Sequence, residues 1–487
     1  MTIFEHIRTF YEYFVFFYGF ALFISYIFLA VTSFISIRKY QRYNLELDDN
    51  YIMASPLTPG ISVVAPAFNE GVTIISNVRS LLTLNYPKFE VIIVNDGSTD
   101  DTLELLIKEF EMEETPFAYV EKIKTRPFKR IFKSRNPAFA LLTVVDKENG
   151  KSKADASNAG INASSFPYYL CTDVDCLLDR NTLLKMIKPI LASNDRVIAV
   201  GATLRMANSC DTDEGIITRV RPPRGIIPRF QELEYLRAYL LSKMGWSLVN
   251  CTPNVSGGLG LFDKEIAVKG GGYDPLSHAE DMDLVTRMMT YMINNKLEYR
   301  ITYVPLSCCW TEGPPNLQIL NRQRTRWGRG LLQLFYVHRK VLFNPQYKRL
   351  GLVVYPYAFI FEFIAPIIEF TGILFFIFLA ITNQVNWSMA AILFTFTYTF
   401  AVMISSLAVL WDQMTYKYYR TWWEVMKLLV MGFLEPFIYH PLIVFFAIKG
   451  YWSYLTQRQH EWGSMTRQGF DPKSKKENVE TTILTNE

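Results

Sequence analysis

The chain has 487 residues, of which 15% are aromatic and 50% hydrophobic, and a formal net charge of +4. So small a charge on so long a chain excludes a nucleic-acid-binding protein, which needs a strongly basic face. None of the six cysteines stands in a Cys-x-x-Cys pair, so reduced buried thiols are expected instead of a zinc site. The apolar residues gather towards the two ends, which predicts a membrane protein with a soluble middle.

The first apolar segment runs from Phe10 to Ile37 and contains one charged residue, Glu12. It exceeds the roughly 20 residues that a helix needs to cross a bilayer and is too long for the core of a signal peptide. Arg38 and Lys39 follow it directly. By the positive-inside rule these residues place the following part of the chain in the cytoplasm. We therefore predict a transmembrane helix within residues 1–40.

After residue 60, apolar runs alternate with helical patterns, which predicts an α/β domain with a mostly parallel sheet. Strands are expected at 61–65 and 90–94, each followed by a helix. Pro66, Phe68 and Glu70 follow the first strand, and Asp96 follows the second. Ligands collect at the carboxyl edge of such a sheet, so these loops are expected to hold a nucleotide. An ordinary strand, turn and capped helix at 95–101 is an equal alternative.

A third apolar run, at 168–172, ends in Asp173 and Asp175. Two carboxylates separated by one residue at a strand exit can both turn towards a divalent cation, and hard oxygen ligands suit Mg²⁺ or Mn²⁺. An Asp-x-Asp pair alone is a weak pattern. Lys153, in a helix expected just before this strand, can reach phosphate oxygens or can be an exposed helix lysine.

Three further patterns lie in the second half of the chain. Small residues at 256–258 let a ligand approach the backbone. The pair Glu280 and Asp281 opens a helix, where acids also complement the helix dipole. Residues 323, 326 and 327 fall on one helix face, although an arginine and tryptophan are also typical of the aromatic belt of a membrane protein.

In this order the motifs resemble those of the membrane-embedded branch of the inverting family-2 glycosyltransferases. That branch includes the hyaluronan, chitin, cellulose and poly-N-acetylglucosamine synthases. The segments that carry the resemblance are Ala65–Glu70, Val94–Ser98, Lys153–Gly160, Asp173–Asp175, Val255–Phe262, His278–Leu284 and Gln323–Trp327. The last, a Gln-x-x-Arg-Trp motif, is the most specific. Ala279 stands where family members often have Thr or Gly, which leaves the acidic pair intact.

The resemblance implies a GT-A nucleotide-sugar-binding fold and a set of site residues. It implies a nucleotide site of Pro66, Phe68, Glu70, Asp96, Lys153 and Asp173, a Mg²⁺ or Mn²⁺ ligand in Asp175, and a catalytic pair of Glu280 and Asp281 with Asp281 as general base. It implies acceptor and diphosphate contacts from Ser256, Gly257, Gly258, Gln323, Arg326 and Trp327.

The function implied is transfer of a sugar from a UDP-sugar to a growing saccharide, with inversion, by a multi-pass protein of the plasma membrane whose catalytic domain is cytoplasmic. N-acetylglucosamine is favoured slightly over glucose as donor sugar. Processive synthesis coupled to export is expected, with the bilayer and an accessory membrane or export subunit as partners. Two alternatives stay open: a non-processive enzyme that glycosylates a lipid, and a non-catalytic membrane-anchored protein that binds or transports sugar nucleotides.

The predicted domain order is a transmembrane helix (1–40), a cytoplasmic GT-A domain (41–317), amphipathic interface helices (318–350), a transmembrane bundle (351–450) and a basic cytoplasmic tail (451–487) with a disordered end. Three apolar blocks, 352–381, 387–411 and 428–448, would leave the C-terminus outside if each crossed once. Basic residues from Lys449 onward favour the cytoplasm. We therefore expect one block, interrupted by proline, not to be a simple span.

Overall fold

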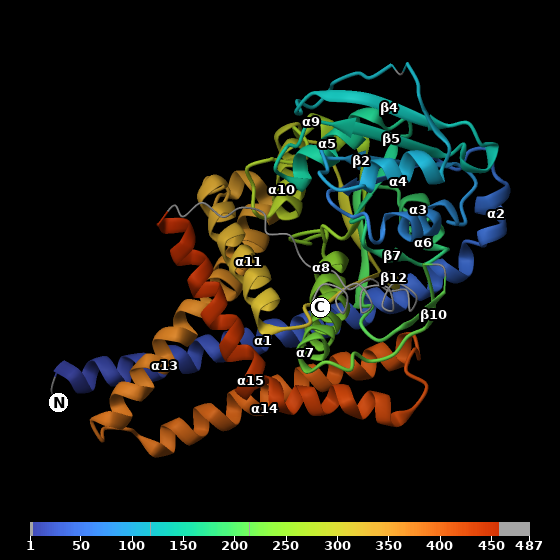
Figure 1. Cartoon of the computed structure of the whole chain (residues 1–487). Helices are drawn as coiled ribbons and strands as arrows, with labels where there is room; N and C mark the ends of the chain where they lie inside the picture. Colours follow the sequence, from blue (N-terminus) through green and yellow to red (C-terminus); the bar gives the residue numbers. More distant parts are fainter. Residues whose placement is uncertain (1–2, 117, 214, 457–487) are drawn as a thin grey trace, which may run out of the picture.

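The computed structural model describes residues 3–116, 118–213 and 215–456. A ten-stranded mixed sheet forms its centre, in the order β3-β4-β5-β2-β1-β6-β11-β8-β12-β7 (Figure 1). The strands are β1 (Ile61–Ala67), β2 (Phe89–Asn95), β3 (Met112–Glu114), β4 (Phe128–Ser134), β5 (Leu142–Lys147), β6 (Tyr168–Thr172), β7 (Leu177–Leu178), β8 (Val197–Met206), β11 (Leu259–Asp263) and β12 (Arg300–Thr311). A separate hairpin consists of β9 (Asp211–Asp213) and β10 (Ile216–Arg219).

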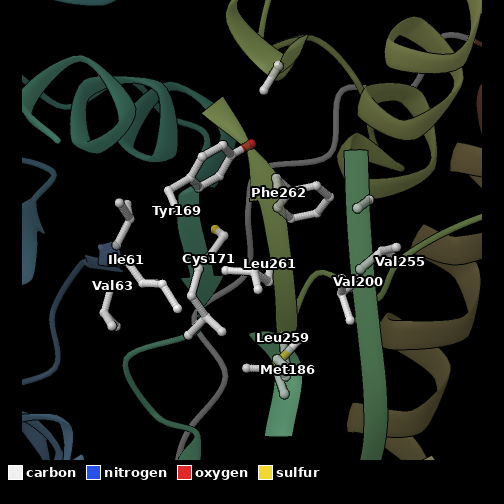
Figure 2. Packing of buried hydrophobic residues seen from close by; sticks show 14 of the residues in the cluster. Ile61, Val63, Tyr169, Cys171, Met186, Val200, Val255, Leu259, Leu261 and Phe262 are labelled. Carbon is white, nitrogen blue, oxygen red and sulfur yellow. The ribbon is translucent and has the colours of Figure 1, made fainter. Parts of the chain in front are cut away.

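The strands β5, β2, β1 and β6 are parallel neighbours, as the alternation of apolar runs and helices predicts. Figure 2 shows buried side chains of β1, β6, β11 and β8 packed together; the rings of Tyr169 and Phe262 stack with centroids 5.3 Å apart. This packing fixes the register, in which Ala67 lies beside Asn95 and Val64 beside Cys171. The carboxyl ends of β1, β2 and β6 therefore meet at one edge of the sheet.

Helices cover the sheet and connect its strands. They are α2 (Asp49–Ala54), α3 (Ile74–Leu82), α4 (Thr102–Glu109), α5 (Lys153–Ala163), α6 (Thr182–Leu191), α7 (Ile226–Leu236), the π-helix η2 (Arg237–Lys243), α8 (Met244–Leu248), α9 (Lys264–Lys269), α10 (Glu280–Asn294) and α11 (Leu317–Val337), with 3₁₀ turns η1 (Pro137–Phe139) and η3 (Pro345–Tyr347). Helix α5 lies so close to the sheet that a β-carbon added at Gly160 would be 2.3 Å from Cγ1 of Val64 in β1.

Four described stretches are long and apolar enough to cross a membrane: Arg8–Arg42, Leu350–Ile381, Trp387–Thr415 and Trp422–Leu455. They belong to α1 (Ile3–Glu46), the irregular run η4 (Leu350–Val354), α12 (Tyr355–Ala358) and η5 (Phe359–Phe363) that leads into α13 (Ala365–Ile381), then α14 (Trp387–Thr415) and α15 (Trp422–Leu455). In Figure 1, α13, α14 and α15 lie beside and below the sheet-bearing part, and α1 runs from among them past the sheet to α2. The chain is thus a membrane protein, as its composition predicts.

Both ends of α15 contact elements of the sheet-bearing part. Near its start, Glu424 pairs with Arg219 of β10 at 3.5 Å. Near its end, Gly450 lies so close to α11 that a β-carbon there would be 2.5 Å from the carbonyl oxygen of Thr325. The helix contains Pro436 between these points. The basic tail and disordered end predicted from the sequence fall almost entirely on residues 457–487, outside the described residues.

Buried ion pairs connect α14 and α7 with the sheet, and α7 with α11. The guanidinium of Arg205, in β8, is fully buried and pairs with Glu232 of α7 at 3.0 Å and with Asp412 of α14 at 2.9 Å. Arg324 of α11 pairs with Glu234 of α7 at 2.6 Å. Buried charges are tolerated only when they are paired and hydrogen-bonded, so these contacts fix how the helices sit against the sheet.

Candidate active site

The loops after β1 and β2 are joined by backbone and side-chain hydrogen bonds. The backbone N–H of Asp96 donates to the carbonyl of Ala67 at 2.9 Å. The N–H of Asn69 donates to Oγ of Ser98 at 3.0 Å, and that of Glu70 to Oγ1 of Thr102 at 2.9 Å. The predicted nucleotide residues Phe68, Glu70 and Asp96 therefore stand together at the sheet edge. Pro66, predicted to follow the first strand, is the last residue but one of β1, because the strand continues to Ala67. The ring of Phe68 is 46% exposed, as a surface on which a base can stack must be.

Asp96 is buried and held by a lysine that sequence reasoning missed. Its Oδ1 accepts hydrogen bonds from Nζ of Lys147 at 2.7 Å and from the N–H of Gly150 at 2.9 Å. The same Nζ lies 2.6 Å from Oδ2 of Asp155, in the first turn of α5. Burial raises the pKa of Asp96 above its ordinary value, and the hydrogen bond from Lys147 opposes that rise.

Lys153 connects α5 with the acidic turn. Its Nζ donates to the carbonyl oxygen of Gly257 at 2.7 Å and forms an ion pair with Asp173. Burial lowers the pKa of Lys153, but the charges of Asp173, Cys171 and Glu280 together outweigh it, and the pKa lies above its ordinary value. The ammonium is therefore a fixed positive charge beside the acidic turn, and the alternative of an exposed helix lysine is wrong.

The acidic turn brings two carboxylates and a thiol together. Ligand atoms of Asp173, Asp175 and Cys176 all lie within 4.8 Å of one another. The N–H of Cys176 donates to the carbonyl of Asp173 at 3.0 Å, which folds the turn back on itself. The two carboxylates fit a hard divalent cation such as Mg²⁺ or Mn²⁺, and the buried thiol adds a softer atom that the sequence did not single out.

Gly257 links this turn to the acidic pair at the start of α10. Its N–H donates to Oδ2 of Asp281 at 3.0 Å, while its carbonyl accepts from Lys153. A β-carbon at Gly257 would be 3.7 Å from Oδ2 of Asp281 and from Oε1 of Glu280. Gly258 in turn lies against Asp173, at 3.7 Å from an added β-carbon to Oδ2. Residues predicted from three separate motifs thus meet at two consecutive glycines.

Glu280 is buried beside Asp281, and burial followed by the charge of Asp281 raises its pKa. The charge of Arg326 is the largest influence that lowers the pKa of Glu280, so the arginine of the Gln-x-x-Arg-Trp motif lies near enough to act on the acidic pair. Helix α11 is held there by Gln333, which accepts from the N–H of His278 at 2.9 Å and donates to the carbonyl of Leu276 at 2.9 Å.

The rest of the motif lies on α11 beside Arg326. Oε1 of Gln323 is buried and has no hydrogen-bond partner among the described residues, which leaves an acceptor for a ligand. The ring of Trp327 is 37% exposed, with the guanidinium of Arg324 4.2 Å from its centroid. Sequence reasoning assigned nothing to Arg324, because only the folded chain brings its partner Glu234 to it.

A second lysine that sequence reasoning missed, the half-buried Lys243, is connected to the start of the glycine stretch. Nζ of Lys243 donates to the hydroxyl of Tyr303 at 3.2 Å, and that hydroxyl accepts from the N–H of Ser256 at 3.4 Å. Burial lowers the pKa of Lys243 to about 8, although the charge of Asp281 raises it. Ser256 is therefore tied to a cation, in addition to its place in the predicted acceptor loop.

Residues 62–232 match the family model described as glycosyl transferase family 2, and residues 235–448 match that of glycosyl transferase family group 2. The chain thus contains glycosyl transferase family 2 domains. The match of these domains confirms the resemblance read from the motifs. Together with the mixed sheet it also confirms the predicted α/β fold of GT-A type. The individual site residues stay predictions, which the geometry above supports but does not test.

The similar proteins include poly-beta-1,6-N-acetyl-D-glucosamine synthases of staphylococci. That of Staphylococcus epidermidis is 29% identical over 371 residues, which are 74% of this chain and 76% of that protein. That of Staphylococcus aureus (strain COL) is 28% identical over 295 residues, 59% of each protein. The match thus spans less than two thirds of the Staphylococcus aureus relatives.

Two solved structures show weaker similarity. The mannosyltransferase PcManGT from Pyrobaculum calidifontis, in complex with GDP-Man and Mn²⁺, is 18% identical, with 91% of this chain and 99% of that chain covered and a TM-score of 0.47. Glucosyl-3-phosphoglycerate synthase from Mycobacterium tuberculosis, in complex with Mn²⁺, UDP and glucosyl-3-phosphoglycerate, is 16% identical, with 59% and 84% covered and a TM-score of 0.34. Similarities this low carry no argument about substrates.

Proposed function

We propose that this glycosyltransferase moves a sugar from a UDP-sugar to the hydroxyl of a growing saccharide, with inversion at the anomeric carbon. The observation that carries the proposal is the pair of hydrogen bonds of Gly257, which place the carboxylate of Asp281 next to Lys153 and the acidic turn. A proton acceptor and a phosphate-binding cation thereby flank one backbone position. The names of the staphylococcal relatives favour N-acetylglucosamine as the sugar.

In this mechanism Asp281 accepts the proton of the acceptor hydroxyl as its oxygen attacks the anomeric carbon. The bond between that carbon and the diphosphate oxygen breaks, and UDP leaves with the bonding electrons. Lys153 and Arg326 neutralise the charge that grows on the diphosphate. Asp173 and Asp175 are the residues that would hold Mg²⁺ or Mn²⁺, whose charge would stabilise the same leaving group.

The remaining residues divide between the two substrates. We assign uridine to Asp96 and to the loop of Pro66, Phe68 and Glu70, whose exposed ring can stack on a base. We assign the acceptor to the stretch Ser256–Gly258 and to Gln323 and Trp327. The exposed indole of Trp327 beside the membrane helices can stack on a sugar of the growing chain, which supports processive synthesis coupled to export, with or without an accessory subunit.

The predicted domain order is retained as part of the proposal, with the catalytic part in the cytoplasm of a plasma-membrane protein. The contacts of α15 reconcile the three apolar blocks, which would leave the C-terminus outside, with the basic residues that favour the cytoplasm. Its start lies at β10 and its end at α11, and both belong to the part placed in the cytoplasm. We therefore propose that α15 bends at Pro436, enters the bilayer and returns, which leaves the C-terminus inside.

The test is incubation of the detergent-purified full chain with a panel of UDP-sugars and Mn²⁺, followed by measurement of UDP release and mass analysis of the product. We expect release of UDP with one sugar and a ladder of oligosaccharides. Absence of UDP release with every sugar, under conditions where the protein is folded, contradicts the proposed transfer. Single-sugar or lipid-linked products contradict processive saccharide synthesis and leave a non-processive transferase.

A further inference from the structure

The ammonium group of Lys147, which pairs with Asp96, is completely enclosed by the protein. The side chain of Lys147 is 0% exposed. An ammonium group has three donors, and each meets an oxygen here: Oδ1 of Asp96 at 2.7 Å, Oδ2 of Asp155 at 2.6 Å and the carbonyl of Glu148 at 2.5 Å. Lys147 therefore has no donor left for a ligand, and its effect on a ligand passes through Asp96.

The two carboxylate oxygens of Asp96 differ in the hydrogen bonds that they accept. Oδ1 accepts from both Lys147 and the N–H of Gly150, whereas Oδ2 accepts no hydrogen bond that the described residues provide. The next residue, Gly97, has a positive φ of 65°, and a β-carbon there would be 2.8 Å from the backbone nitrogen of Asn149. The backbone therefore turns sharply directly after Asp96, at the edge of the sheet where we place the base.

The protonation state of this carboxyl decides which base edge it can bind. An ionised carboxylate only accepts hydrogen bonds, whereas a protonated one also donates. Uracil offers an N–H at its ring position 3, and cytosine offers an unprotonated nitrogen at the same position. Burial raises the pKa of Asp96, Lys147 opposes the rise, and the neighbouring carboxylate of Asp155 adds to it.

We propose that Lys147 is a positioning residue that sets the nucleobase preference of the site, by holding Asp96 as a pure acceptor that matches uracil and rejects cytosine. This inference rests on the proposed function, which places the base at Asp96. Removing the cation leaves Asp96 as a buried carboxyl with no positive charge to oppose the effect of burial, and such a carboxyl retains a proton, with or without the acid of Asp155 beside it. A protonated Asp96 would donate to cytosine, so the selectivity would fall or reverse.

The same lysine joins the two ends of the nucleotide site. Asp155 lies two residues after Lys153 in the first turn of α5, and its Oδ1 also accepts from the N–H of Arg126 at 3.1 Å. Lys147 therefore holds the base-binding carboxylate and the start of the diphosphate-binding helix in one cluster. This link explains why a strand-end lysine is buried, where an ordinary lysine would extend into solvent.

The experiment compares binding of UDP and CDP to the full chain in detergent, with Mn²⁺, by calorimetry at several pH values. The main variant is Lys147→Met combined with Asp155→Asn, which removes one positive and one negative charge together and so avoids two unpaired buried acids. Asp155→Asn alone keeps the pair of Lys147 and Asp96. The matched control for loss of a buried lysine elsewhere is Lys188→Met, because Lys188 is also buried and pairs with Asp49 at 2.7 Å.

We expect the wild-type chain and Lys188→Met to prefer UDP, and the double variant to lose about tenfold or more of that preference, which corresponds to one exchanged hydrogen bond. The preference of the double variant should recover as the pH rises and Asp96 ionises, which a merely structural defect would not do. In Asp155→Asn the preference for UDP should persist to lower pH than in the wild type.

The outcomes separate this inference from the proposed function. A folded double variant whose ratio of UDP to CDP affinity equals that of the wild type at every pH overturns the role of Lys147. If the double variant does not fold, an unchanged pH dependence in Asp155→Asn overturns it instead. A wild-type chain that binds neither nucleotide, or both equally, contradicts the placement of uridine at Asp96.

Discussion

Replacement of Asp281 by asparagine removes a proton acceptor while it preserves the shape of the side chain. Oδ2 of Asp281 accepts the N–H of Gly257 at 3.0 Å and Oδ1 accepts the N–H of Met282 at 2.8 Å. The single amide oxygen of asparagine can keep the bond from Gly257 and gives up the local bond from Met282. The glycine loop, and with it the bond from Lys153 to the carbonyl of Gly257, should therefore stay in place. What is lost is the ability to take a proton from an acceptor hydroxyl.

The expected loss in the rate of transfer follows from the role of a general base. A positioned base contributes about 10² to 10⁴ in rate, which is about 3–5 kcal/mol of barrier. The bond to Gly257 changes from a charged to a neutral acceptor, which is worth about 1 kcal/mol and therefore about fivefold in UDP affinity at most. Transfer and UDP binding should thus respond very differently to the same substitution.

The assay measures UDP release from the donor sugar and, separately, the affinity for UDP. Asp195→Asn is the matched control, because Asp195 pairs only loosely with Arg300, at 3.6 Å, and is half exposed. We expect the control to behave as the wild type in both measurements. If Asp281→Asn lowers UDP affinity by the same factor as transfer, Asp281 belongs to the nucleotide site and its assignment as base is wrong.

Three further substitutions probe the scaffold. Gly97→Ala places a β-carbon 2.8 Å from a backbone nitrogen at a φ of 65°, so it should destabilise the chain by about 1–3 kcal/mol and weaken UDP binding, as thermal unfolding and titration would show. Arg205→Met leaves two buried acids unpaired and should cost about 3–5 kcal/mol in thermal unfolding, whereas Arg221→Met, at a partly exposed pair, should cost about 1 kcal/mol or less. The pKa of Lys243 is lowered to about 8, whereas that of a lysine in an unfolded chain is about 10.4. Between these two pH values the unfolded chain binds more protons than the folded one, so the free energy of unfolding should rise with pH. Lys243→Met should flatten this rise in a series of unfolding measurements at different pH.

The sequence alone identified the parts of the site that depend on neighbours along the chain. Asp173 and Asp175 follow an apolar run, and such a run is recognisable without knowledge of its partners. The order of the motifs then indicated the family, which the family match confirms. The long apolar helices were equally readable, although α15 begins at Trp422, six residues before the predicted block. What was readable was local composition and periodicity.

The two missed lysines show what periodicity cannot reveal. Lys147 is buried and Lys243 half-buried because groups from distant segments surround them, namely Asp96 and Asp155 for the first and Tyr303 for the second. In sequence each is a lysine at the end of an apolar stretch, and the ordinary expectation for it is exposure. A lysine directly after a run that predicts a buried strand is the one signal that pointed to Lys147.

Residues on both faces of α11 set the position of the Gln-x-x-Arg-Trp motif, although the motif itself does not include all of them. Arg326 lies near enough to Glu280 for its charge to lower the pKa of that acid. Arg324 and Gly328 contact other helices: Arg324 pairs with Glu234 of α7, and a β-carbon at Gly328 would lie 2.7 Å from the carbonyl of Ala447 in α15. Because α11 is clamped between the sheet side and a membrane helix, the position of Arg326 and Trp327 relative to the acidic pair is set by the membrane bundle. The site is therefore complete only when α15 is packed against α11.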